Sequence, residues 1–214
     1  MSAPNSPRMS SGMSGARPSR GWHSRGYLPH FDSEHVVQHV TFHLADSLPA
    51  AALSRMRNLV QTAPVERRQA ELRKLIEAWM DSGHGCCILA RNAAGQLVED
   101  TLLASDGARY HLLAWAVMPN HVHALLQTDP GWPLPHIVSS WKSFTGRRLA
   151  PLMATATSTP VKHVWHREYW DRFIRDRNHL AIAMEYIHNN PVKAGLVRHP
   201  AEWPWSSARL LKQD

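Results

Sequence analysis

The chain has 214 residues, enough to bury one substantial hydrophobic core, so we expect one domain with short tails. Its formal charge of +7 comes from 24 basic against 17 acidic residues, which favours a polyanionic partner. The sequence has no apolar run long enough to cross a membrane and no secretory signal. We therefore expect a cytoplasmic protein without a membrane partner.

The two ends of the chain are expected to lie outside the folded domain. Residues 1–25 are predicted to form a disordered, basic leader, because Ser, Pro, Gly and Arg dominate the segment. The domain itself is predicted over residues 26–207, followed by a tail at 208–214. Cys86 and Cys87 are adjacent, a spacing that suits neither a zinc site nor an ordinary disulfide. We expect them to be small core residues in a reducing compartment.

The first half of the chain predicts alternating strands and helices. Residues 35–44 are rich in β-branched and aromatic side chains and predict a strand. Residues 63–80 carry apolar side chains at helical spacing, with Pro64 near the start. A short strand at 86–90 and a short helix at 96–104 follow.

A histidine pair stands in the middle of the chain. Residues 110–117 form a nearly unbroken apolar run, which is typical of a strand covered on both faces. The turn residues Met-Pro-Asn at 118–120 then predict an antiparallel hairpin. Because side chains alternate along a strand, His121 and His123 project from the same face of the second strand, as two metal ligands would.

The second half predicts two helices separated by a linker. A helix over 135–149 is followed by a linker of small residues and Thr at 151–160. A further helix over 177–190 carries one apolar stripe, and Pro191 stops or kinks it. The mixture predicts an α+β fold, in which helices pack on one face of an antiparallel sheet.

A tyrosine and an amide lie one helical turn apart in this last helix, at Tyr186 and Asn190. Residues four apart share a helix face, so both groups can approach an ion held by the histidine pair. Two imidazoles and one amide oxygen leave coordination positions open for a phosphate oxygen. A phenol ionises near pH ~10 and needs assistance at neutral pH, for which Lys193 and Lys142 are alternatives.

Longer strings around these residues resemble one family. A-W-A-V-M-P-N-H-V-H-A-L-L, V-W-H-R-E-Y-W-D-R-F-I-R-D and M-E-Y-I-H-N-N-P-V-K-A-G-L-V, with the early G-Y-L-P-H-F-D, are similar to the REP-associated tyrosine transposases. These are relatives of the single-tyrosine HUH transposases of the IS200 type. The resemblance spans residues 26–207 in the expected order.

The resemblance implies a fold, a cofactor and a substrate. The fold would be ferredoxin-like, with the histidines on a central strand and the tyrosine on a C-terminal helix. His121, His123 and Asn190 would bind Mg²⁺ or Mn²⁺, and Tyr186 would form a 5′-phosphotyrosine. The substrate would be single-stranded DNA folded into imperfect palindromic hairpins, cut and transferred by a nucleoid-associated enzyme.

Some assignments have competing explanations. Asn190 is also suited to ending a helix before Pro191. Among the other tyrosines, Tyr110 has the pattern of a packed core ring, and Tyr169 suits either base stacking or the core.

Candidate contacts to nucleic acid combine cations for phosphates with tryptophans for unpaired bases. A solvated basic face and a packed core explain these residues almost as well. The set is Trp141, Lys142, Arg147, Arg148, Trp165, Arg167, Trp170, Arg172, Arg175 and Lys193.

Two other functions are compatible with the sequence. One is a non-catalytic, regulatory hairpin-binding protein that retains the fold, and the other is a metallohydrolase that uses the histidine pair on small substrates. The sequence leaves open the DNA target, a monomer or a homodimer, and whether the tyrosine serves its own subunit or a partner.

Overall fold

The computed structural model describes residues 21–24, 29–33, 35–62, 64–157 and 162–211. The sheet at its centre, as far as the described residues go, is antiparallel and runs in the order β4-β5-β3-β6. In that order the strands are Tyr110–Val117, His121–Thr128, Val37–His43 and Trp170–Phe173.

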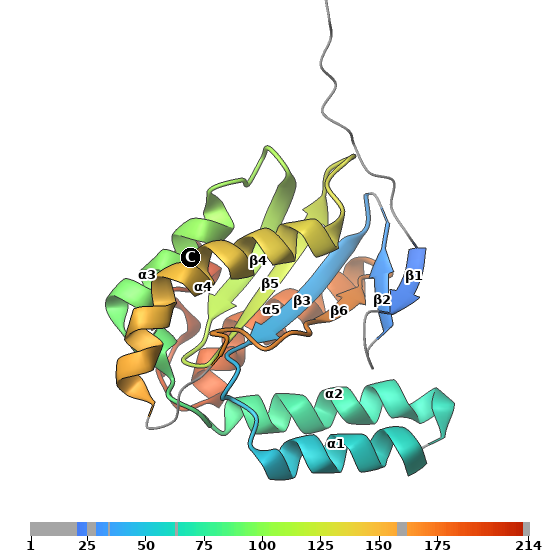
Figure 1. The fold of residues 1–214 in the computed structure, drawn as a ribbon. Helices are drawn as coiled ribbons and strands as arrows, with labels where there is room; N and C mark the ends of the chain where they lie inside the picture. The colour runs from blue at the N-terminus through green and yellow to red at the C-terminus, as the bar shows by residue number, and fades with distance from the viewer. Residues whose placement is uncertain (1–20, 25–28, 34, 63, 158–161, 212–214) are drawn as a thin grey trace, which may run out of the picture.

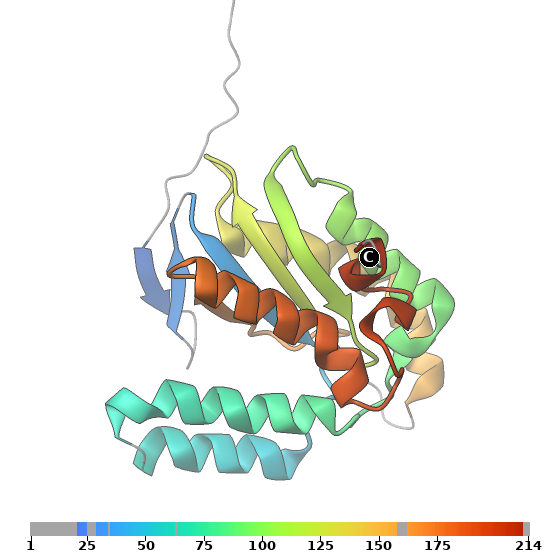
Figure 2. The ribbon, with the colours of Figure 1, turned by 180° about the vertical axis from the view of Figure 1, so that it is seen from behind.

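The connections make the fold ferredoxin-like, as predicted. Along the chain the elements follow β3-α3-β4-β5-α4-β6, where α3 is Asn92–Leu103 and α4 is Leu134–Ala156. These two helices cover one face of the sheet, and α5, Arg177–Lys193, crosses the other face (Figures 1 and 2). The prediction that helices cover one face only is therefore wrong. The apolar stripe of α5 is buried against the second face.

The strand β5 is buried on both faces, and its side chains divide between two cores. One set joins the large core under α3 and α4, and consists of Val122, Ala124 and Leu126. Leu125 belongs to the smaller core under α5, and the period-two alternation places His121 and His123 on that same side.

A helical hairpin is inserted between β3 and α3. It consists of α1, Ala50–Thr62, and α2, Val65–Asp81, and it lies below the sheet in Figure 1. The helix predicted over 63–80 corresponds to α2, whereas α1 was not predicted. The pair has its own apolar core, which includes Met56 and Ile76.

Two internal predictions are wrong. The strand predicted over 86–90 is instead the 3-10 helix η1, Ile88–Ala90, because the chain turns at Cys87, which has a φ of 49°. The linker predicted over 151–160 is helical as far as Ala156, since Leu149 and Met153 anchor this end of α4 in the core. Residues 158–161 of that linker lie outside the described residues.

Both predicted domain boundaries also need correction. Within the predicted leader, β1, Gly21–Ser24, pairs with β2, Pro29–Asp32, while residues 1–20 lie outside the described part. Within the predicted tail, the 3-10 helix η3, Ser207–Leu210, is anchored in the fold. No helix in the described part of the chain combines the length and apolar character needed to cross a membrane.

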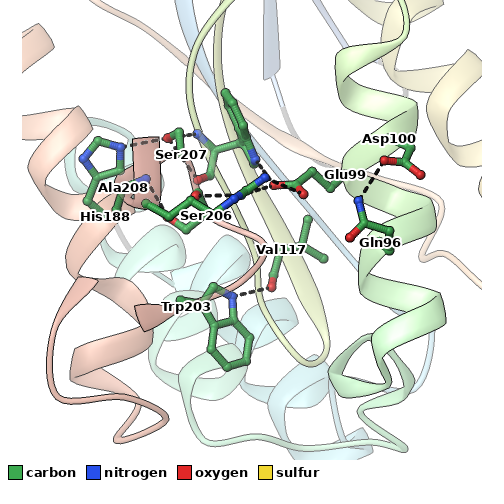
Figure 3. A network of polar contacts seen from close by, with 11 residues as sticks. Gln96, Glu99, Asp100, Val117, His188, Trp203, Ser206, Ser207 and Ala208 are labelled. Carbon is green, nitrogen blue, oxygen red and sulfur yellow. Dashed lines mark hydrogen bonds and ion pairs between the residues drawn. The ribbon is translucent and has the colours of Figure 1, made fainter. Parts of the chain in front are cut away.

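A buried carboxylate holds η3 in place (Figure 3). Glu99 of α3 is 1% exposed and accepts hydrogen bonds from the Trp115 indole at 2.7 Å and from both terminal nitrogens of Arg209. Beside it, the Ser207 hydroxyl contacts His188 of α5 at 2.8 Å. The C-terminal segment therefore joins α3, β4 and α5.

Arg209→Ala should lower the free energy of unfolding by about 3 kcal/mol, because it leaves Glu99 buried without its cation. The measurement is the urea midpoint of unfolding. The control is Arg198→Ala, which removes an exposed arginine, and equal midpoints for the two variants would contradict this account.

A second ionic contact fixes the β1–β2 hairpin to β6. His30 of β2 is buried, and its ring nitrogens contact Asp171 and, at 3.5 Å, Glu168. Burial alone would lower the pKa of His30, but the hydrogen bonds and negative charges of the two carboxylates outweigh it and raise the pKa. Asp171 also accepts the Phe31 amide at 2.8 Å.

The attachment of this hairpin should weaken with rising pH. Because the folded state raises the pKa of His30 above its ordinary 6.5, the stabilisation is complete below pH 6.5 and is lost as the pH passes the raised value. Hydrogen exchange at the Phe31 amide, corrected for intrinsic rates, should show this loss of protection. His30→Gln should remove the pH dependence, and an unchanged profile in that variant would refute the assignment.

Candidate active site

The strands β3 and β5 together form the wall of the site. Their register pairs His121 with His43 and His123 with Thr41, and paired residues share one face of the sheet. His39 lies two residues before Thr41 and therefore points to the same side. The alternating His-x-Thr-x-His spacing on β3 is a sequence signal for this wall.

The two predicted histidines face each other. Their Nε2 atoms lie 3.0 Å apart, and both side chains are buried. The Nδ1 of His121 lies 2.7 Å from the Asn120 amide oxygen, which can only accept, so His121 donates from Nδ1 and keeps its lone pair on Nε2. The Thr41 hydroxyl, 2.9 Å from the Nδ1 of His123, can accept in the same way.

The environment keeps both rings uncharged. Burial lowers the pKa of His121 to about 3. Burial is the main reason that the pKa of His123 lies well below its usual range. Repulsion between a protonated His123 and positive charge on His121, His39 or Lys193 lowers it further. Neutral imidazole is the form that binds metal ions, so the pair needs no deprotonation at physiological pH.

Asn120 connects this pair to the inserted helical hairpin. Its amide nitrogen donates to the carbonyl of Met80 at 3.1 Å and to that of His84 at 2.9 Å. Its oxygen holds His121, as described above. The end of α2 therefore orients a candidate ligand, a role that turn chemistry alone did not predict for Asn120.

The helix α5 brings the predicted amide to the same point. Asn190 is fully buried, and its amide nitrogen lies 2.9 Å from the Nε2 of His123. The helix continues through Pro191 to Lys193, so the alternative that Asn190 ends the helix is wrong. Its Oδ1 is buried and has no hydrogen-bond partner among the described residues. The two ends of an amide can exchange by rotation, which would turn this oxygen towards His123.

These atoms fit a six-coordinate divalent ion. Ligand atoms at neighbouring corners of an octahedron, each about 2.1 Å from the ion, lie about 3.0 Å from each other. The observed separations of 3.0 Å and 2.9 Å match that spacing. The described residues contain no group of three or more His, Cys, Asp or Glu side chains suited to a metal ion, so further corners would be left to water or substrate.

The predicted nucleophile lies beside the pair in the same chain. The ring of Tyr186 packs edge-on against His123 with centroids 5.5 Å apart, and against His39 at 5.9 Å. The hydroxyl oxygen is buried. The Lys193 ammonium lies 4.7 Å from the ring centroid. Of the other tyrosines, Tyr110 is a core ring whose hydroxyl donates to the Leu102 carbonyl, as its pattern suggested.

A groove of about 1070 Å³ lies between α4 and the segment 162–169 and contains part of the predicted nucleic-acid set. Arg147 and Arg167 are exposed there. The Lys142 ammonium donates to the carbonyls of His166 and Arg167 at 2.7 and 2.8 Å, and burial lowers its pKa to about 8. This lysine therefore shapes the groove rather than presenting a free cation.

The tryptophans of the set do not form an exposed stacking surface. Trp141 and Trp165 are buried in the main core, and their indoles donate to Tyr110 and Thr145, although Trp165 also borders the groove. Trp170 packs against the α1–α2 core and stacks on His43. Burying these large apolar rings is favourable, so they pack in the cores even though arginines are their neighbours in the sequence.

The remaining cations lie elsewhere on the surface. Arg148 is exposed and stacks on Phe144, while Arg172 and Arg175 are exposed in and after β6. Lys193 lies at the tyrosine, away from the groove residues.

Comparison with known proteins shows what this chain is similar to. Residues 96–190, from α3 to the buried asparagine, match the family described as Transposase IS200 like. This match covers less than half of the chain and shows that this segment is similar to the IS200-like transposases. The chain is 30% identical over 105 residues to a Haemophilus influenzae protein and 29% identical over 98 residues to an Escherichia coli protein, both named as REP-associated tyrosine transposases.

The extent of these likenesses is partial. Each match covers 46% of this chain, and 58% and 54% of the relatives' lengths respectively. A solved REP-associated tyrosine transposase bound to a REP hairpin aligns over 86% of both chains with a TM-score of 0.54 and 16% identity. This similarity shows that the chain described here shares its fold.

Proposed function

We propose that this protein is a transposase of the IS200-like kind, acting as a metal-dependent, single-stranded DNA endonuclease and strand transferase. The proposal rests on one observation: the Tyr186 ring packs against His123, with centroids 5.5 Å apart, and His123 belongs to an imidazole pair that burial keeps neutral. Imperfect, REP-like palindromic hairpins are the proposed substrate, because a protein of this fold was solved with a REP hairpin. The tyrosine and the histidines come from one chain, so a monomer is sufficient, and a homodimer remains compatible.

The proposed cofactor is Mg²⁺ or Mn²⁺, held by His121, His123 and the Asn190 amide. Bound there, the ion would polarise a phosphate oxygen of the DNA and stabilise charge on the departing 3′ oxygen. Asn120 and Thr41 would keep the two rings oriented, as partners of the distal ring nitrogens commonly do in metal sites.

In the proposed reaction the Tyr186 oxygen attacks the scissile phosphorus. The new oxygen–phosphorus bond forms as the bond to the 3′ oxygen breaks, the phenol proton passes to solvent, and the 3′ oxygen takes up a proton. The products are a 5′-phosphotyrosine and a free 3′-hydroxyl. Attack by a 3′-hydroxyl on the phosphotyrosine releases the tyrosine and rejoins DNA, so no energy cofactor is required.

The groove beside α4 is the proposed path for the DNA backbone. Arg147, Lys162 and Arg167 supply exposed cations along it. His166 lines the groove and stacks on His43 with centroids 4.5 Å apart, and His43 pairs with His121. One ring that lines the groove therefore contacts the histidine wall of the site.

The central test is covalent capture of DNA. The protein, with Mn²⁺ and a labelled single-stranded hairpin oligonucleotide, should give a conjugate that survives denaturing electrophoresis. Tyr186→Phe should abolish the conjugate and leave hairpin affinity within about twofold, because only the attacking oxygen is lost. The control Tyr110→Phe removes a core hydroxyl and should keep conjugation.

Three other results would contradict the proposal. Hairpin binding without a conjugate in the unmodified protein would favour a non-catalytic regulator. Indifference to DNA would favour a small-molecule hydrolase. Conjugation that survives in Tyr186→Phe would refute the nucleophile.

Metal binding is a separate prediction. His121→Ala should weaken Mn²⁺ binding by about 10–100-fold or more, since it removes a ligand, and cleavage should return partly at high Mn²⁺. Titration calorimetry with Mn²⁺ measures the change directly. His111→Ala, which removes an exposed imidazole from β4, is the control and should bind Mn²⁺ normally. Equal affinities in all three proteins would exclude this centre.

A further inference from the structure

The strand β6 presents an arginine on the same face of the sheet as the site. Trp170, at the start of β6, stacks on His43 of β3, with ring centroids 5.4 Å apart. Ile174, just after the strand, packs in the core under α5. Because side chains alternate along a strand, Arg172 between them projects from this same face. Its side chain is exposed to solvent.

The register of the sheet places Arg172 beside the candidate nucleophile. β6 pairs with β3 so that Arg172 lies opposite His39, and paired residues on neighbouring strands have Cβ atoms about 5 Å apart. The centroid of the His39 ring lies 5.9 Å from that of Tyr186. The Nε2 of His39 lies 3.2 Å from the Nδ1 of His123. The long side chain of Arg172 therefore starts next to a residue that contacts both the tyrosine and a proposed metal ligand.

Other candidate cations differ from Arg172 in position or in shape. Arg147 and Arg167 line the groove beside α4, and α4 and α5 cover opposite faces of the sheet (Figures 1 and 2). Lys193 lies over the Tyr186 ring, but an ammonium acts as a point charge. A guanidinium is planar and always charged, and its forked N–H groups match the oxygens of a phosphate. Arg172 combines this shape with a position at the site.

We propose that Arg172 is a catalytic residue that donates to the non-bridging oxygens of the scissile phosphate and stabilises their negative charge in the transition state. This proposal rests on the proposed function. While the Tyr186 oxygen bonds to phosphorus and the bond to the 3′ oxygen breaks, the guanidinium keeps all its protons. Strand rejoining takes place at the same phosphorus atom, so one contact serves both steps.

The first test separates the rate of conjugation from DNA affinity. Single-turnover formation of the covalent conjugate is measured with Mn²⁺ over a range of hairpin concentrations. Arg172→Met keeps an unbranched side chain without its charge, and it should slow conjugation at saturating DNA by about 100-fold, a usual loss for one transition-state donor. Arg172→Lys should regain part of the rate, because it restores the charge without the fork.

The matched control is Arg198→Met, which changes another exposed arginine and should keep the unmodified rate. The urea midpoint of Arg172→Met should equal that of the unmodified protein, because the side chain is exposed. A lower midpoint would trace the slower rate to a weakened fold and overturn the assignment.

The second test removes the charge from the DNA instead of from the protein. The scissile linkage is first located by mapping the conjugate of the unmodified protein. A methylphosphonate is then placed there, in which a methyl group replaces one charged oxygen. Arg172→Met should lose much less rate with this hairpin than with the natural one. Equal losses would show that Arg172 does not act on the phosphate charge. If the methylphosphonate hairpin reacts too slowly to measure, the first test decides.

The remaining outcomes separate this inference from the proposed function. If the unmodified protein gives no conjugate, the proposed function itself fails. If Arg172→Met conjugates at the normal rate, Arg172 is a spectator. If it only needs more DNA to reach that rate, Arg172 contacts the DNA away from the scissile phosphate. In both of these cases this inference fails while the nucleophile stands.

Discussion

The structure depends on keeping two uncharged imidazoles buried side by side in the middle of a sheet. A buried polar nitrogen without a partner is costly, so each Nδ1 needs a hydrogen-bonding group supplied by the fold. Thr41 meets this need only if β3 lies beside β5 in the observed register. Asn120 supplies this group for His121 only if its own amide is held by the carbonyls of Met80 in α2 and of His84 just after it. The site thus constrains three segments that are distant in sequence.

The two faces of the sheet have different tasks. The face under α3 and α4 holds most of the large apolar side chains and gives the molecule its main core. The face under α5 holds a smaller core and the polar groups of the candidate site. The α4 groove and the histidine wall are in contact where His166, which lines the groove, stacks on His43 of β3. A side-chain movement in the groove can therefore shift the histidine wall through the stacked rings of His166 and His43.

Much of this arrangement could be predicted from the sequence, since the decisive signals were local and periodic. The strand over residues 110–117, the hairpin after it and the i, i+4 spacing of Tyr186 and Asn190 follow from short-range geometry, and the structure brings these groups together. What could not be predicted depended on tertiary context. The helix α4 continues through Pro151 because buried side chains on either side outweigh the missing hydrogen bond. The tryptophans near arginines were buried, and nothing local marked Asn120 as a neighbour of the site.

The C-terminal segment described above also limits how copies of this protein can assemble. β4 is an edge strand, and an exposed edge invites another chain to extend the sheet. At its far end the Val117 amide is already taken by the Trp205 carbonyl, and Ser206 bridges Ala116. The Trp205 indole fits there because Gly95 has no side chain to collide with it. A second copy would have to displace this segment before it could pair with β4 at that end. A stable dimer would therefore form at lower free-energy cost through another surface.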